Sequence, residues 1–249
     1  MPVISSSRYT VKLAEDIKEV QAALRLRYEI FGKELDRISE VNESSSLEKD
    51  QFDDQFHHLI VLDRGTNEVI GTYRLQTYGQ ASNGLGFTTN FRFYLEQFPP
   101  DLLKNAVEAG RACIAKEHRS GMVLYLLWKG LATYLRHFGK GYLFGYAALD
   151  TTNPQTAFRT YAYLKQQNHL HTNIWIERRQ GFTEPWPHHE NGKEVDIPLL
   201  FQHYLNVGSK VCGGPSFDHN YRLIHFLILL DVNSIPDQTR KMFLDKIPS

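Results

Sequence analysis

The sequence has only two cysteines, Cys113 and Cys212, among 249 residues. They lie far apart and both sit among apolar neighbours, so we expect buried, reduced thiols rather than a disulfide framework. The histidines do not combine with these cysteines at a zinc-site spacing, and no metal is predicted. So low a cysteine content favours a reducing cytoplasm.

Long apolar runs are also missing. No stretch approaches the roughly 18 to 20 uninterrupted apolar residues of a membrane-spanning helix, and the first ten residues show no charged leader. The 28 Lys and Arg balance the 28 Asp and Glu, and without a basic block the chain lacks the charge that phosphate binding needs. We therefore expect a cytoplasmic protein that neither spans the membrane nor binds nucleic acid.

Apolar spacing predicts an alternation of helices and strands, which indicates an α/β sandwich around one mixed sheet. We expect a single domain over residues 1–249, with a C-terminal extension from about residue 181. The polar segment 39–51 and the segment 181–198, rich in Pro, His and Gly, are predicted to be a mobile loop and a lid or connector. Residues 80–89 are predicted to loop out before a short aromatic helix at 93–98. The main helices are expected at 15–31, 122–138, 154–167 and 198–207, and the strands at 57–63, 69–75, 107–114, 142–149 and 226–232.

An acidic cluster follows the first helix, with Glu48, Asp50, Asp53 and Asp54 around Phe52. Carboxylates so close together repel each other, which water tolerates and which a bound cation relieves. The cluster is therefore either a solvated loop or part of a site that holds a cationic group.

A second candidate is the pair Glu108 and Arg111, which lies inside an otherwise apolar strand. Regular alternation would place the two side chains on opposite faces, but a bulge at Gly110 would re-aim them. Buried charges are costly unless they are paired or used, so the pair is either a structural ion pair or part of a site. The following turn at 119–121 opens a helix, whose free N–H groups bind anions, unless it is a plain turn.

These features occur in one order that resembles the acyl-homoserine-lactone synthases, a branch of the GNAT-like acyltransferases. The shared patterns are Arg-x3-Phe on an N-terminal helix, Glu-x-Asp-x-Phe-Asp, an Arg in the next hairpin, and Glu-x2-Arg on the central strand. Here these positions are Arg27 and Phe31, then Glu48, Asp50, Phe52 and Asp53, then Arg74, and finally Glu108 and Arg111.

The chain resembles the hemolysin-like GNAT acyltransferases still more closely, over nearly its whole length. That group includes the ornithine-lipid and glycine-lipid synthases. It shares Glu-x-Gly-Arg, a His-Arg-Ser-Gly turn, and a Lys-Val-Cys-Gly-x-Pro segment with a following Asp, here residues 210–215 and Asp218. Arg37 replaces a Trp of the lactone synthases, which counts against S-adenosylmethionine as acceptor. The acetyl-CoA loop is half present, because His118 and Val123 flank Gly121.

The resemblance implies a GNAT-like three-layer sandwich and an N-acyltransferase. It would move a 3-hydroxyfatty acyl group from acyl carrier protein to the α-amine of an amino acid such as ornithine or glycine, the first step of an aminolipid pathway. No cofactor would be bound permanently, and the donor would be an acyl-phosphopantetheine, with acyl-CoA as an alternative. Association with the inner face of the membrane stays open.

The same resemblance assigns the site. Glu108 and Arg111 would be catalytic, and an acidic carrier protein would suit the basic side chains near the turn. A CoA-dependent acetyltransferase and a non-catalytic module that binds an acyl carrier or a lipid are the alternatives. The residues expected to bind the acceptor substrate are Arg27, Phe31, Asp50, Asp53 and Arg74. Those expected to bind the acyl-phosphopantetheine arm are Ala112, Cys113, Ile114, Arg119, Ser120 and Gly121. The basic side chains near the turn are Lys116, Arg119, Lys129, Arg136 and Lys140.

Overall fold

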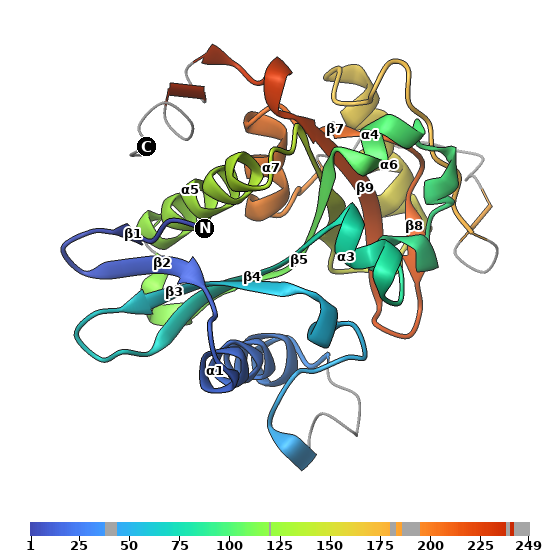
Figure 1. Ribbon diagram of the computed structural model, residues 1–249. Helices are drawn as coiled ribbons and strands as arrows, with labels where there is room; N and C mark the ends of the chain where they lie inside the picture. Colours follow the sequence, from blue (N-terminus) through green and yellow to red (C-terminus); the bar gives the residue numbers. More distant parts are fainter. Residues whose placement is uncertain (38–43, 120, 180–182, 186–194, 238–239, 242–249) are drawn as a thin grey trace. The chain divides into compact units, whose positions relative to one another are not determined.

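The computed structural model describes residues 1–37, 44–119, 121–179, 183–185, 195–237 and 240–241 (Figure 1). They form two compact units, the first containing residues 1–85 and 109–140 and the second residues 86–108 and 141–237. Strand β5 (Ala106–Ile114) runs through the boundary, so its first three residues belong to the second unit and the rest to the first.

The first unit is an antiparallel sheet between two helices. Its strands lie in the order β1 (Ile4–Ser5), β2 (Tyr9–Leu13), β3 (His57–Asp63), β4 (Val69–Thr77), followed by β5. The predicted hairpin of β3 and β4 is confirmed, with Leu59 opposite Tyr73 and a bulge between Val61 and Leu62. Figure 1 shows α1 (Ile17–Arg27) over one face of this sheet and α5 (Met122–His137) over the other.

Both helices of the first unit follow from their sequences. Asp16 caps α1 by accepting from the Glu19 N–H, and Arg27 lies on the buried face of the helix. The helix continues as a wider π-helical segment, Tyr28–Glu34. In α5 the apolar side chains at four-residue steps are all buried, so one face of the helix points inward. These side chains are Val123, Leu127, Leu131 and Leu135.

The sheet is mixed because the second unit contains a parallel pair of strands. Here β5 runs parallel to β6 (Tyr142–Leu149), and β6 is antiparallel to β9 (Leu223–Asp231). Strands β7 (Lys210–Val211) and β8 (Ser216–Asp218) are also antiparallel to β9. The predicted strands and helices of this region, including α6 (Pro154–Gln166) and α7 (Leu199–Asn206), are confirmed.

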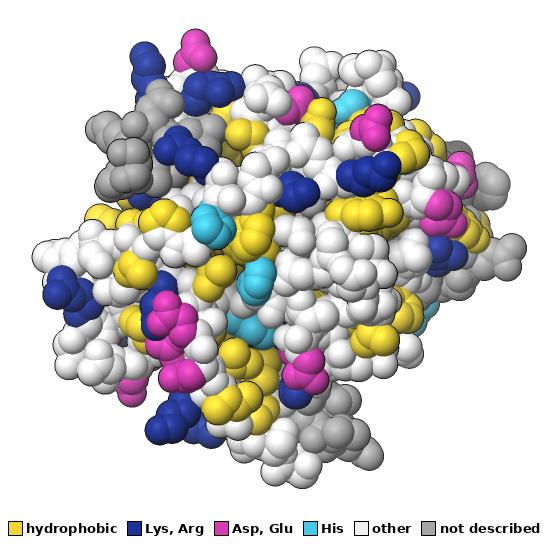
Figure 2. Space-filling model, in the orientation of Figure 1, with side chains coloured by type: hydrophobic (Ala, Val, Ile, Leu, Met, Phe, Trp, Pro, Cys, Tyr) yellow, Lys and Arg dark blue, Asp and Glu magenta, His cyan; other side chains and the backbone are white. Residues whose placement is uncertain are grey.

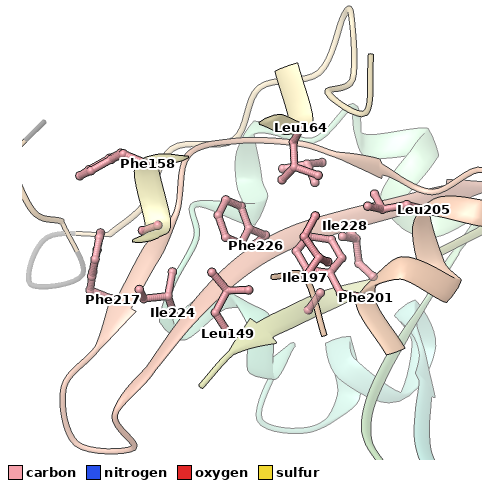
Figure 3. Close-up of a cluster of buried hydrophobic side chains, with 13 residues drawn as sticks. Leu149, Phe158, Leu164, Ile197, Phe201, Leu205, Phe217, Ile224, Phe226 and Ile228 are labelled. Atoms are coloured by element: carbon pink, nitrogen blue, oxygen red, sulfur yellow. The ribbon is translucent and has the colours of Figure 1, made fainter. Parts of the chain in front are cut away.

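A hydrophobic core lies between α6, α7 and one face of β6 and β9 (Figure 3). Phe158 of α6, Phe201 of α7 and Phe226 of β9 are almost completely buried in it. Fully burying one such aromatic side chain contributes roughly 1.5 to 3 kcal/mol. Because β9 alternates, this face carries Ile224, Phe226 and Ile228, and the opposite face carries Leu227 and Leu229, which are buried as well.

Two predictions between β4 and β5 are wrong. Residues 80–89 do not simply loop out, because α3 (Tyr78–Asn83) forms there behind a capping box of Thr77 and Gln80. The aromatic helix expected at 93–98 does not form, because that range contains only one short 3-10 turn, η4 (Leu95–Gln97), which follows another such turn, η3 (Thr88–Phe91). Pro100 begins α4 (Pro100–Lys104), since the first helical position tolerates proline.

Other expectations concern loops, charges and cysteines. Residues 38–43 of the predicted mobile loop, and 181–182 and 186–194 of the predicted lid, lie outside the described residues.

Both cysteines are buried and free, and burial raises the pKa of each thiol to about 12. In the part of the chain that the structure describes, no helix is long and apolar enough to cross a membrane, and no three His, Cys, Asp or Glu could hold a metal. On the face shown in Figure 2 the basic side chains are dispersed among acidic and apolar ones.

One close approach fixes how α5 packs on the first unit's sheet. A Cβ added at Gly130 would lie 2.8 Å from Leu59 Cδ2 and 2.9 Å from Val11 Cγ1, whereas one at the exposed Gly79 of α3 would meet nothing nearer than 3.9 Å. Ala is favoured over Gly in helices by about 1 kcal/mol, but overpacking costs about 1 to 3 kcal/mol. We expect Gly130→Ala to lower the free energy of unfolding in urea by about 1 kcal/mol and Gly79→Ala to raise it by up to about 1 kcal/mol. Stabilisation by both substitutions would contradict the close approach.

Candidate active site

Six charged side chains of the first unit form a closed ring in which positive and negative groups alternate. Four segments supply them: α1, the 48–53 segment, β4 and β5. The order around the ring is Arg27, Glu48, Arg111, Asp50, Arg74, Asp53 and back to Arg27.

Arg27 is the buried anchor of this charge ring. Its Nη1 and Nη2 donate to the two carboxylate oxygens of Asp53 at 2.6 and 3.1 Å, and its Nε donates to Glu48. The contact to Asp53 is bidentate, the arrangement for which the planar guanidinium is best suited.

Arg74 and Arg111 complete the charge ring from β4 and β5. Arg74 Nη1 donates to Asp50 Oδ1 at 2.7 Å and to Asp53 Oδ1 at 3.0 Å, and its guanidinium also lies over the ring of Phe56. Arg111 Nε donates to Glu48 Oε1 at 3.0 Å, while its Nη2 lies 3.4 Å from Asp50 Oδ2. The contact between Arg111 and Asp50 is therefore the longest link of the ring.

Burial is uneven around the charge ring. The Arg27, Asp53 and Arg74 side chains are at most 3% exposed, whereas those of Arg111 and Asp50 are 26% and 29% exposed. One edge of an otherwise buried, neutral cluster thus meets solvent. The hypothesis of a merely solvated acidic loop is wrong for Glu48 and Asp53, although Asp54 is exposed.

The ring shifts the ionisation of its members. Burial by itself would raise the pKa of Asp53, but the guanidinium groups of Arg27 and Arg74 and the Asp50 N–H outweigh it and lower that pKa well below its ordinary range. Burial likewise opposes ionisation of Glu48, yet Arg111 and Arg27 lower its pKa. Burial would lower the pKa of Arg27, but Glu48 and Asp53 raise it. The ring therefore keeps these three charges at neutral pH.

Strand β5 departs from regular geometry at Arg111. Its φ of 53° lies in the left-handed region, which non-glycine residues rarely adopt. The irregularity expected at Gly110 is thus found one residue later. Such strain persists only where surrounding contacts over-determine it, and the two carboxylates that receive the Arg111 guanidinium supply those contacts.

Glu108 is held by threonines in the second unit. Its Oε1 accepts from Thr88 Oγ1 at 2.8 Å, from Thr89 N at 2.6 Å and from Thr89 Oγ1, and its Oε2 accepts from Thr88 N at 3.1 Å. The side chain is almost fully buried. Its orientation is therefore set by the first residues of the η3 turn.

The remaining predicted residues fall into two neighbouring groups of the first unit. Phe31 packs with Cys113 and Ile30 in a small apolar cluster, next to the β5 residues assigned to the acyl-phosphopantetheine arm. Arg119 donates to Glu34 through two bonds of 2.6 and 2.7 Å and to the Ile114 carbonyl. Gly121 precedes α5 with a φ of 87°, and Ser120 lies outside the described residues.

Sequence reasoning missed Thr88, Thr89 and Glu34. Adjacent threonines are common at the start of a helical turn, so their capping tendency was visible. Nothing in the sequence connected them with a carboxylate twenty residues later. Glu34 lies just beyond the predicted end of the first helix, which the π-helical segment extends.

The ring predicts a stability that depends on Asp53. Removing one partner of a buried pair costs about 3 to 5 kcal/mol, because the other charge stays buried. We expect Asp53→Asn to lower the free energy of unfolding at pH 7 by that amount, measured by urea denaturation. Asp54→Asn is the matched control, one residue away but exposed, and should change little.

The same pair predicts a pH dependence. The pKa of native Asp53 lies below its ordinary value, so the stability it adds is complete above the unfolded pKa of about 4 and falls as the pH drops further. Wild-type stability should therefore decline below about pH 4, and Asp53→Asn should decline less steeply. Equal slopes for the two proteins would contradict an ionised Asp53 in the ring.

Comparisons with known proteins agree with this fold. A family model described as an acetyltransferase (GNAT) domain matches residues 26–129. An L-ornithine Nα-acyltransferase of Rhodobacter capsulatus is 26% identical over 250 residues, which cover 96% of this chain and 96% of that protein. A protein of the same name from Brucella abortus is 27% identical, with 90% of this chain and 85% of that protein covered.

Solved structures share the architecture at low identity. The CoA-dependent acyl-homoserine lactone synthase BjaI superposes with a TM-score of 0.51 at 16% identity, over 94% of this chain and 85% of that chain. The acyl-homoserine lactone synthase LasI gives 0.50 at 13% identity, over 98% of each chain. These two likenesses establish the fold, and the sequence relatives add the enzyme class. The chain is an acyltransferase with a GNAT-like fold.

Proposed function

We propose that this enzyme transfers a 3-hydroxyfatty acyl group from acyl carrier protein to the α-amine of ornithine, the first step of an aminolipid pathway. The observation that carries the proposal is the match to proteins named L-ornithine Nα-acyltransferase along 90–96% of the chain. Glycine is the alternative acceptor. On this proposal the whole chain acts as one acyltransferase, and its amphiphilic product suits an enzyme that works at the inner face of the membrane.

The donor is proposed to be acyl carrier protein rather than CoA. Gly121 is flanked by His118 and Val123, so the usual acetyl-CoA loop is incomplete. The carrier is acidic and complements the basic side chains on and around α5, such as Lys116 and Lys129. Arg119 contributes less to this surface than its charge suggests, because Glu34 already neutralises it.

The acceptor is proposed to bind at the exposed edge of the charge ring. Ornithine carries two ammonium groups and a carboxylate, and at the longest link of the ring Asp50 offers the opposite charge to one ammonium group and Arg111 to the carboxylate. A guanidinium binds a carboxylate in bidentate fashion, while an ammonium group can bind a single carboxylate oxygen. The buried Arg27, Asp53 and Arg74 would hold these two residues in place.

The reaction is proposed to be a direct transfer in a ternary complex. The amine nitrogen attacks the thioester carbonyl, a C–N bond forms, and the C–S bond breaks to release the carrier thiol. The amine loses a proton to Glu108, directly or through water, and the departing thiolate gains one. Backbone N–H groups of β5 are suited to stabilise the oxyanion.

Two other functions are testable against this one. A CoA-dependent acetyltransferase would use acetyl-CoA and leave the long-chain carrier thioester untouched. A non-catalytic module would bind acyl carrier protein or lipid without releasing free thiol.

The product identifies the function. We expect cells that express the chain to accumulate an N-acyl ornithine, detected by mass spectrometry of extracted lipids. The purified protein should release thiol from 3-hydroxyacyl carrier protein only when ornithine is present, and more slowly from the matching acyl-CoA. Turnover of acetyl-CoA alone, or no turnover with any donor, would overturn the proposal.

The role of Glu108 predicts a separate kinetic result. Glu108→Gln should reduce turnover by about two orders of magnitude or more, because the amide cannot accept the proton. The glutamine amide also presents N–H groups to the threonine donors, which can destabilise the fold. The melting temperature of the variant is therefore measured together with its turnover. Glu96→Gln is the control, since it removes an exposed carboxylate that does not contact Glu108, and it should keep the wild-type turnover. Wild-type turnover in folded Glu108→Gln would contradict the assignment of Glu108 as the base.

A further inference from the structure

The η3 turn holds the Glu108 carboxylate by hydrogen bonds. Thr88 and Thr89 direct their backbone and side-chain donors at its carboxylate. Four residues of 3-10 helix are not stable alone, because nucleating a turn costs more than its few hydrogen bonds return. The position of Glu108 thus depends on whatever fixes this turn to the rest of the second unit.

An ion pair fixes the far end of the turn. Arg92, which caps η3, donates from Nη2 to Asp218 Oδ2 of β8. The Arg92 guanidinium lies 5.3 Å from the centroid of the Tyr146 ring on β6. Asp218 is paired opposite Leu223 of β9 and also accepts from the Tyr221 N–H. The turn is therefore tied to the strands of the second unit through this carboxylate, and Arg179 also donates to Asn90 and to the Arg92 carbonyl.

The Arg92–Asp218 pair is the buried one among the charged contacts of this turn. Its side chains are 15% and 4% exposed, whereas the Arg179–Glu96 pair is 31% and 61% exposed. Exposed pairs contribute little, while breaking a buried pair by removing one charge is strongly disruptive. Arg92 follows Thr89 by three residues, about 6 Å along a 3-10 helix. A displacement of Arg92 is therefore passed directly to the threonines.

We infer that Asp218 is a positioning residue for the acyl transfer: through Arg92 and the η3 turn it fixes the direction of the Glu108 carboxylate. The inference rests on the proposed function, in which Glu108 accepts the proton of the amine. It also gives a role to Asp218 as the residue that follows the segment 210–215. The resemblance to a known family includes this Asp but assigns no role to it.

Positioning and plain stabilisation differ in what they change. Loss of a purely structural ion pair lowers the melting temperature and leaves the remaining folded enzyme with normal kinetics. Loss of a positioning pair changes the chemistry of the folded enzyme. A misplacement of about 1 Å can reduce the rate by up to about 100-fold without weakening substrate binding.

The test uses Asp218→Asn in the full chain, assayed with the donor and acceptor that the wild type uses. We expect kcat to fall by about 10- to 100-fold, with both KM values within about three-fold of wild type. Glu96→Gln, which removes a carboxylate from the exposed pair nearby, should keep the wild-type kcat.

Arg92→Lys covers the case in which Asp218→Asn does not fold. It keeps the positive charge but loses the planar guanidinium, and it should show the same loss of kcat at nearly unchanged KM in milder form. A variant with a lower melting temperature but wild-type kcat would overturn the inference. If Glu108 is not the base, Glu108→Gln retains its activity, and the proposed function fails. If Glu108→Gln loses activity while Asp218→Asn and Arg92→Lys keep theirs, only the positioning role of Asp218 is refuted.

Discussion

Charge neutrality in the buried ring is the constraint on which the first unit depends. Three guanidinium groups and three carboxylates alternate, so each charge has an opposite neighbour on both sides. A buried ion is tolerated only with such compensation, and removal of any member leaves its neighbours uncompensated. Since α1, the 48–53 segment, β4 and β5 each contribute, the ring also selects one mutual arrangement of these four segments.

Much of this could be predicted from the sequence, for reasons that differ between elements. The helix containing Arg27 and the face of α5 follow from apolar spacing, which is a local property. Four ring members, Glu48, Asp50, Asp53 and Arg111, were found as charged residues in apolar or crowded surroundings. Arg27 and Arg74 were found through the resemblance to a known family. Closure of the ring could not be predicted, because Arg111 and Glu48 are 63 residues apart and no local pattern encodes that contact.

The failures have a common cause in segments where propensity is ambiguous. Phe93, Leu95 and Phe98 have helical spacing, yet they are buried from 3-10 turns and connecting residues. Pro100 is compatible with both the end and the beginning of a helix, and tertiary packing decided between them. The threonines that hold Glu108 lie in this same stretch, so the misassigned region concealed the partners of that carboxylate.

Strand β5 positions its two charged residues by independent means. Glu108 depends on an uncharged set of donors on a short turn, whereas Arg111 depends on carboxylates and adopts a left-handed φ to reach them. On the proposed function, the electrostatics favour an acceptor that carries both charges. A carboxylate at Arg111 and an ammonium group at Asp50 would restore the alternation of charge between these two residues. A simple amine would satisfy Asp50 alone and leave Arg111 with one partner fewer. The acceptor is therefore proposed to bind at the link that is longest and most exposed.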